Sequence, residues 1–303
     1  MPLPGGMPPT TRDLVGYGRR PPDPRWPGGA RLALSFVVNV EEGAELSLAS
    51  GDARNESLHE IREEVDGVPD PCMETHYAYG ARAGFWRILD AFAAHGMPAT
   101  FSACGRAVAA NPFLAREAHA AGHEVSAHGW RWERHAEMEE ATERAVIAAT
   151  VAAIRDATGE APLGWHTRSA ASPNTRRLLI EHGGFLYDSD AYDDDLPRLH
   201  APGHVILPYG FDCNDMRFSP GGGFVQAEDF ARYCIGAIEW LLAEGERAPK
   251  MLSIGLHLRI IGRPGRMAGL AAVLAHVARR PEIWVARRRE IAAHWLARVA
   301  EGL

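Results

Sequence analysis

The chain alternates apolar segments of strand length with segments of helical periodicity, from Leu32 almost to its C-terminus. The segment 32–38 is almost continuously apolar, which is typical of a parallel strand that is covered on both faces. The segment 79–95 instead repeats its apolar residues at helical spacing. Repeated strand–helix units without a break in composition predict a single α/β domain built around a parallel barrel.

Periodicity also predicts where the other elements lie. We expect helices over residues 79–95, 137–158, 227–244, 267–279 and 288–301. We expect strands within residues 98–104, 125–127, 163–167, 185–190, 204–212, 251–259 and 282–286. The polar stretch 46–72 has no periodicity and predicts a long loop, and loops of that length are usually functional.

Composition limits the class of protein. A chain of 303 residues that is 46% hydrophobic can bury a large core, and a net charge of −7 argues against nucleic-acid binding. No apolar run reaches the length of a membrane span. The Pro- and Gly-rich residues 1–30 contain no signal-peptide pattern, so we expect a cytoplasmic protein with an irregular arm over 1–30 and one barrel domain over 31–303. The cysteines are far apart and predict free thiols: Cys72, Cys104, Cys213 and Cys234.

Polar side chains follow many of the predicted strands at the point where each strand ends. These residues are Asn39, Glu41, His128, Trp132, the segment 165–168, Asp188, Asp190, Asn214, Asp215, Arg217, His257 and Arg259. One such residue is readily explained as a capping or surface group. Their recurrence after successive strands predicts an active site at the carboxyl face of the barrel.

Several of these stretches resemble the polysaccharide deacetylase family. The resemblance is carried by AGHEVSAHG at residues 121–129, by the preceding PATFS and by SIGLH near the C-terminus. Within that superfamily the chain is most similar to the cofactor-independent bacterial allantoinases, through stretches spread over residues 12–295 that include YGARAGFWRIL, GHEVSAHGWRW, GGFLYDSDAYDDDLP and KMLSIGLHLRIIGRPGRM. The resemblance implies a deformed (β/α) barrel and the opening of a cyclic amide ring, allantoin to allantoate in purine catabolism.

The chain departs from the zinc-dependent members of this family at their metal site. Those enzymes have two aspartates and two metal histidines where this chain has Asn39 and Glu41, and His128 and Trp132. An indole has only an N–H donor and cannot ligate a metal, whereas a catalytic zinc needs about three protein ligands. We therefore expect no metal and no other cofactor, although the sequence leaves open whether His135 or His166 completes a metal site.

Opening a ring amide without a metal requires a base, an acid and an oxyanion donor. The catalytic candidates are His128, His257 and Glu41, and the sequence does not settle which histidine is the base and which the acid. The candidates for substrate binding are Asn39, Glu74, Trp132, Arg168, Asp215 and Arg217. For Glu74 and Arg217 a surface ion pair is an equally good interpretation.

The segment Trp165–Ser169 leaves more than one substrate class to be considered. Allantoinases tend to have Trp-Tyr-Thr-Gly-Arg here, and this chain has an additional His166 and an arginine displaced by one position. The alternatives are a related cyclic imide or hydantoin hydrolase, a metal-dependent carbohydrate N-deacetylase and a non-catalytic binding protein. The expected partner is a small cyclic ureide or imide, and the resemblance implies a homo-oligomer, a tetramer.

Overall fold

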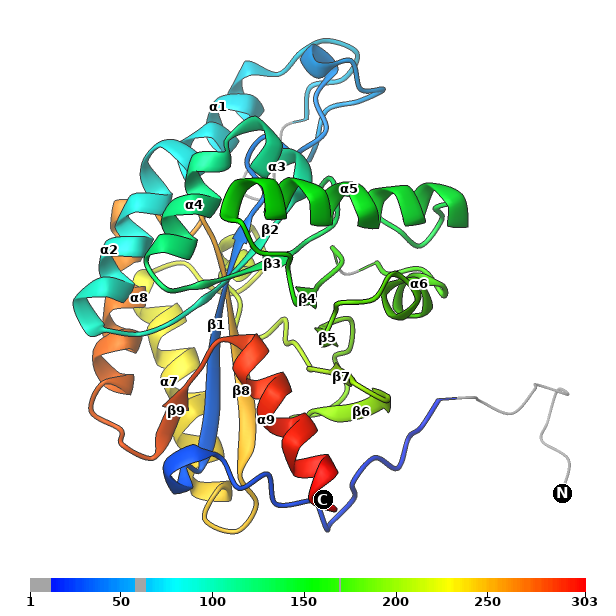
Figure 1. The fold of residues 1–303 in the computed structure, drawn as a ribbon. Helices are drawn as coiled ribbons and strands as arrows, with labels where there is room; N and C mark the ends of the chain where they lie inside the picture. The colour runs from blue at the N-terminus through cyan, green and yellow to red at the C-terminus, as the bar shows by residue number, and fades with distance from the viewer. Residues whose placement is uncertain (1–11, 58–63, 169) are drawn as a thin grey trace, which may run out of the picture.

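The computed structural model describes residues 12–57, 64–168 and 170–303, which form an α/β fold around one curled sheet (Figure 1). The strands are β1 (Leu32–Val40), β2 (Thr100–Ala103), β3 (Glu124–Ala127), β4 (Gly164–Trp165), β5 (Tyr187–Asp188), β6 (Arg198–Ala201), β7 (His204–Ile206), β8 (Lys250–His257) and β9 (Ile283–Val285). Within the described residues they lie in the order β6-β7-β5-β4-β3-β2-β1-β8, with β9 beside β1. The α/β fold and the deformed barrel expected from the sequence are confirmed.

Helices cover the outer face of this sheet (Figure 1). They are α1 (Pro71–Tyr79), α2 (Phe85–His95), α3 (Gly105–Ala110), α4 (Pro112–Ala120), α5 (Glu140–Thr158), α6 (Thr175–His182), α7 (Ala227–Glu244), α8 (Pro264–Val277) and α9 (Arg288–Ala300). Single turns of 3-10 helix lie at Pro27–Gly29, Leu48–Ser50 and Asp215–Phe218. No helix in the described parts of the chain is both long and apolar enough to cross a membrane.

The sheet is mixed, and one strand pair departs from the parallel barrel that the strand–helix alternation predicts. Strands β6 and β7 pair antiparallel. A tight turn joins them, and Gly203 in that turn has a φ of 78°, a conformation that glycine adopts without steric cost. The remaining pairs are parallel, so their carboxyl ends meet at one edge.

The predicted helix 79–95 is in fact two helices joined by a π-helical turn over Gly80–Gly84. The turn has a steric reason, because a Cβ on Gly80 would lie 2.1 Å from Glu42 Oε1 and one on Gly84 2.0 Å from the carbonyl oxygen of Leu258. The helical region starts earlier than expected, at Pro71, because the Asp70 side chain accepts hydrogen bonds from the first backbone N–H groups. The predicted loop 46–72 is correspondingly shorter.

The core lies between the sheet and the helices. All nine residues of β1 are buried, as expected for a central strand. Side chains of the arm also contribute, since Trp26 lies 5.8 Å from Trp284 and 6.2 Å from Trp295 between ring centroids. Residues 1–11 of the predicted arm lie outside the described residues, and the division at residue 30 stays a prediction.

Candidate active site

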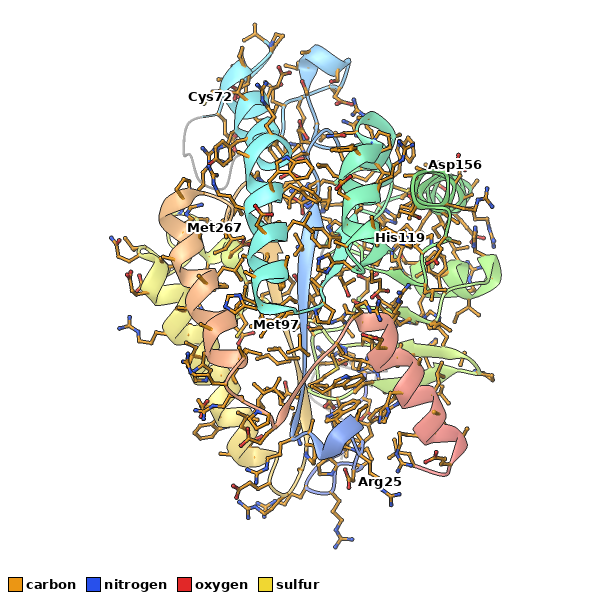
Figure 2. All side chains as sticks on the ribbon, turned by 60° about the vertical axis from the view of Figure 1, so that its left-hand side comes forward. Arg25, Cys72, Met97, His119, Asp156 and Met267 are labelled. Atoms are coloured by element: carbon orange, nitrogen blue, oxygen red, sulfur yellow. The ribbon has the colours of Figure 1, made fainter. Side chains whose placement is uncertain are left out.

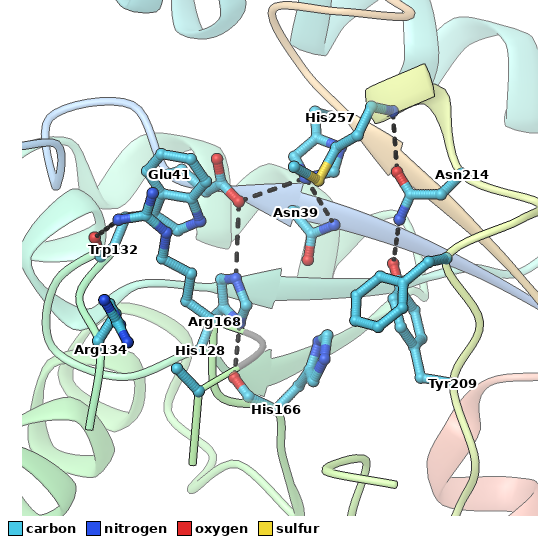
Figure 3. A pocket seen from close by; sticks show the side chains of 13 residues that line it. Asn39, Glu41, His128, Trp132, Arg134, His166, Arg168, Tyr209, Asn214 and His257 are labelled. Atoms are coloured by element: carbon cyan, nitrogen blue, oxygen red, sulfur yellow. Dashed lines mark hydrogen bonds and ion pairs between the residues drawn. The ribbon is translucent and has the colours of Figure 1, made fainter. Parts of the chain in front are cut away.

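A cavity of about 330 Å³ opens at the carboxyl ends of β1, β3 and β8 (Figure 3). Its walls are formed by Asn39, Glu41, His128, Trp132, Arg134, His166, Arg168, Ala170, Tyr209, Phe211, Asn214, Met216 and His257. Strand register explains why these positions meet. Asn39 of β1 lies opposite His257 of β8 in the parallel pair, so residues that are far apart in the chain share one edge of the sheet.

The Glu41 carboxylate lies at the centre of this cavity and uses its two oxygens differently. Oε1 is 3.6 Å from Nε2 of His128 and 3.4 Å from Nε2 of His257. Oε2 accepts a hydrogen bond of 2.7 Å from the guanidinium of Arg259. Burial alone would raise the pKa of Glu41, but the charges of His257 and Arg259 hold it well below its ordinary value. Glu41 is therefore a buried anion.

His257 is oriented by Asp215. Its Nδ1 is 2.6 Å from Oδ1 of Asp215, and its backbone N–H donates to Oδ2 of the same carboxylate at 2.7 Å. Burial alone would lower the pKa of His257, but the negative charges of Glu41 and Asp215 raise it to about 10. The ring is thus an imidazolium at neutral pH, with Nε2–H directed at Glu41 and the amide of Asn39 3.3 Å away.

His128 has a different environment. Its Nδ1 is 2.6 Å from the backbone carbonyl of His166, and a carbonyl only accepts, so Nδ1 carries a proton. The Nε2 atom faces Glu41 and is available to take or give a proton. The two histidines therefore present their ε nitrogens to the same carboxylate oxygen, His257 from the end of β8 and His128 from the residue after β3.

Trp132 and Arg168 form one side of the cavity (Figure 3). The Arg168 guanidinium lies 3.3 Å from the centroid of the Trp132 ring and donates to the Trp132 carbonyl. It also forms an ion pair of 3.3 Å with Glu56. Guanidinium stacking on an indole is favourable, and here it fixes both side chains.

His166 and Tyr209 form the opposite side. Their ring centroids are 4.5 Å apart, and Nε2 of His166 is 3.3 Å from the hydroxyl of Tyr192. Burial lowers the pKa of His166 well below its ordinary value. His166 is therefore a neutral, planar wall of the cavity.

Comparisons with known proteins place the chain in a family. A Schizosaccharomyces pombe protein named as a polysaccharide deacetylase is 38% identical over 95% of this chain and 98% of its own length. The chain belongs to the polysaccharide deacetylase family. The model of that family matches residues 67–186, which include β2, β3 and His128.

Two solved structures of similar proteins agree with this fold. The crystal structure of PuuE allantoinase is 45% identical, covers 95% of this chain and 98% of that chain, and superimposes with a TM-score of 0.91. A probable polysaccharide deacetylase from Pseudomonas aeruginosa PAO1 is also 45% identical, covers 94% and 98% respectively, and has a TM-score of 0.90. The family is therefore one of hydrolases. The names of these two similar proteins give different activities.

In this member of the polysaccharide deacetylase family, the side chains of the cavity do not fit a catalytic zinc ion. Trp132 offers no lone pair, and Arg259 already neutralises Glu41. Within the described residues no group of three or more His, Cys, Asp or Glu is arranged to hold a metal ion. His135 does not line the cavity, because its ring bonds Glu143 at 3.0 Å.

The structure brings most of the sequence-predicted site residues together. The cavity is lined by Asn39, Glu41, His128, Trp132, Arg168 and His257. Asp215 lies behind His257 and bonds its ring, so its contact with the site is indirect. The functional role of each residue remains a prediction.

Besides Asp215, two predicted substrate-binding residues do not line the cavity. Glu74 of α1 accepts a hydrogen bond of 2.5 Å from Ser47, and Arg217 lies between the rings of Phe224 and Tyr233. Sequence reasoning also missed wall residues: Arg134, Tyr209, Phe211 and Met216. Tyr209 could have been found from its place after an apolar run, but Arg134 lies in a loop with no periodic signal.

Proposed function

We propose that this protein is a hydrolase that opens the ring of a cyclic ureide without a metal, with allantoin to allantoate as the first reaction to test. The observation that carries the proposal is the arrangement around Glu41, whose Oε1 faces two histidines while Arg259 binds Oε2. A carboxylate held in this way keeps one histidine protonated and faces a second that has a free ε nitrogen. An acid and a base are both needed to break an amide bond.

In the proposed reaction His128 Nε2 removes a proton from water as the water oxygen attacks the ring carbonyl carbon. Glu41 stabilises the imidazolium that forms on His128. His257 donates its Nε2 proton to the departing ring nitrogen as the C–N bond breaks. The products are a carboxylate and a ureido group on one open chain. His128 passes the proton that it took from water to His257 by way of Glu41, and the proton of the new carboxylic acid is released to solvent, so both histidines return to their starting states.

The remaining side chains of the site position the ring. Asn39, only 3% exposed, has an amide oxygen without a hydrogen-bond partner among the described residues. This oxygen can accept an N–H of a ureide. His166, Tyr209 and Phe211 add aromatic surface to the wall of the cavity, and such surface suits a planar five-membered ring.

A hydrolysis screen tests the proposal. Protein treated with a chelator is incubated with allantoin, hydantoin, a dihydropyrimidine, succinimide and an acetylated chitin oligomer. Opening of allantoin supports the allantoinase reaction, and turnover of hydantoin or succinimide alone moves the assignment to a related cyclic amide hydrolase. Deacetylation of the chitin oligomer only after zinc is added would replace the proposal with a metal-dependent carbohydrate deacetylase.

A further inference from the structure

Arg134 is a charged residue of the cavity that the proposed reaction does not use. It is exposed, it lines the cavity, and its guanidinium makes no hydrogen bond or ion pair with the described residues. The other cations of the wall have acidic partners, since Arg168 binds Glu56 and His257 binds Asp215. In Figure 3 dashed lines join Glu41 to His128 and His257, and Arg168 to Trp132, and none reaches Arg134.

The backbone on both sides of Arg134 is fixed. The N–H of Trp132 donates to the carbonyl of Ala44 at 3.2 Å, and the N–H of His135 donates to the carbonyl of Ala170 at 2.9 Å. The loop therefore presents Arg134 at the cavity from a defined position. A side chain held in this way loses less entropy on binding a ligand than one on a free loop.

The charge of the cavity is opposite to that of the whole chain. The chain has a net charge of −7, yet the charged groups of the cavity balance in pairs apart from one cation. Glu41 pairs with Arg259, Glu56 with Arg168 and Asp215 with His257, which leaves the positive charge of Arg134. A positive cavity in an acidic protein concentrates anions at that one place.

Arg134 lies away from the groups proposed to break the amide bond. Figure 3 places it beside Trp132 and Arg168 and well apart from His257. A ring whose carbonyl faces His128 and His257 would therefore direct a substituent, and not the reacting carbonyl, toward Arg134. The guanidinium fork matches the two oxygens of a carboxylate.

We propose that Arg134 is a specificity-determining residue that binds a carboxylate on the ring substituent, so that anionic cyclic ureides are preferred over neutral ones. This inference rests on the proposed ring-opening function and names its substrate class. The probe is hydantoin-5-acetate, which carries a carboxylate on a hydantoin ring, and hydantoin is the neutral reference. The variant Arg134→Gln removes the charge and keeps most of the side-chain length.

The measured quantity is the ratio of kcat/KM for hydantoin-5-acetate to kcat/KM for hydantoin. One charge-assisted contact at a partly exposed site should contribute about tenfold, so we expect the ratio to fall about tenfold in Arg134→Gln. The control is Arg279→Gln, which removes an equal charge from an exposed position after α8 and outside the cavity, and the ratio should stay as in the wild type. An unchanged ratio in Arg134→Gln, or an equal fall in both variants, overturns the inference while leaving the ring-opening function intact.

Calorimetric titration with hydantoin-5-acetate separates failure of the inference from failure of the proposed function. If neither hydantoin is opened, the proposed function fails, and binding alone decides the role of Arg134. We expect wild-type protein to bind this probe about tenfold more tightly than Arg134→Gln, with the difference shrinking in high salt. No binding by the wild type, or equal binding by both proteins, overturns the inference.

Discussion

Asp215 accepts two hydrogen bonds from His257, one from the ring Nδ1 at 2.6 Å and one from the backbone N–H at 2.7 Å. A third N–H, that of Ile261, donates to the same carboxylate at 3.1 Å. The Asp215 carboxylate thus fixes the His257 ring at the end of β8 and determines which ring nitrogen faces the cavity. Asp215 thus orients the proposed acid and, together with Glu41, favours its charged form, although Asp215 does not line the cavity.

The variant Asp215→Asn tests this positioning role. Loss of the negative charge should lower the pKa of His257, which the charges of Glu41 and Asp215 raise to about 10. Because the proposed reaction uses the protonated form of His257, the alkaline limb of the kcat/KM profile should move to lower pH. At neutral pH we expect a fall of about 10² in kcat, at the low end for a general acid.

The pH–rate profile and the NMR titration of the His257 ring measure this effect. A purely structural role would lower the rate equally at every pH and would leave the alkaline limb in place. The conservative variant Asp215→Glu keeps the charge and should retain the position of the limb even if its rate is lower. An unmoved alkaline limb in Asp215→Asn would contradict the positioning role.

The free energy of unfolding should depend on the protonation of His257. Its pKa is raised from an ordinary value of 6.5 to about 10 in the folded protein. The stabilisation it provides is complete below pH 6.5, where the unfolded chain is also protonated, and is lost as the pH rises to 10. The variant His257→Gln should therefore lose less stability than the wild type between pH 6.5 and pH 10.

Urea midpoints at several pH values across this range measure the difference. His276→Gln is the matched control, because His276 lies on α8 away from the cavity and bonds the surface residue Glu239. This control should follow the wild-type curve. A wild-type curve as flat as that of His257→Gln would show that His257 does not titrate as described.

The site residues at strand ends could be predicted, because the apolar pattern of the sequence and the parallel order of the strands both place them at the same edge of the sheet. An apolar run that ends in polar residues identifies a buried strand and its functional end, as for Asn39 and His257, and parallel pairing then brings the two ends together. The curvature and the antiparallel β6 were not predictable in this way. They depend on a turn at Gly203 and on pairing between short strands that carry little periodic signal.

The side-chain contacts on which the proposed chemistry depends could not be predicted from the sequence either. Arg259 and Glu41 are separated by 218 positions, and periodicity does not indicate which carboxylate a strand-end arginine will meet. Glu74 was placed in the site by resemblance, but its helix begins at Pro71 and directs it to Ser47. Arg134 has no signal in the sequence because its position depends on backbone hydrogen bonds of its neighbours.

Gly84 should be required for the position of the segment after β8. Its backbone is helical, with φ of −62°, and a Cβ there would lie 2.0 Å from the backbone oxygen of Leu258. The variant Gly84→Ala should therefore displace residues 258–262, cost about 1–3 kcal/mol of unfolding free energy and lower activity by moving His257. Gly236→Ala in α7 is the control, since nothing lies within 4 Å of a Cβ there.

Chemical denaturation and kcat/KM measured on both glycine variants distinguish a local clash from a general effect of alanine. Gly236→Ala should be neutral or stabilising by up to about 1 kcal/mol, because alanine favours a helix over glycine. Equal stability and activity in the two variants would mean that residues 258–262 move aside without affecting the site.

The last prediction concerns zinc. Purified protein should contain substoichiometric zinc and keep its activity after chelation, because Trp132 stands where a metal histidine would be and Arg259 binds Glu41 at 2.7 Å. Trp132→His should bind zinc more tightly than the wild type, and Trp132→His/Arg259→Leu more tightly again, because only the double variant frees both oxygens of Glu41. Competition with a chromogenic chelator measures the order of affinities. Stoichiometric zinc in the wild type, with activity lost on chelation and restored by zinc, would contradict the metal-free mechanism.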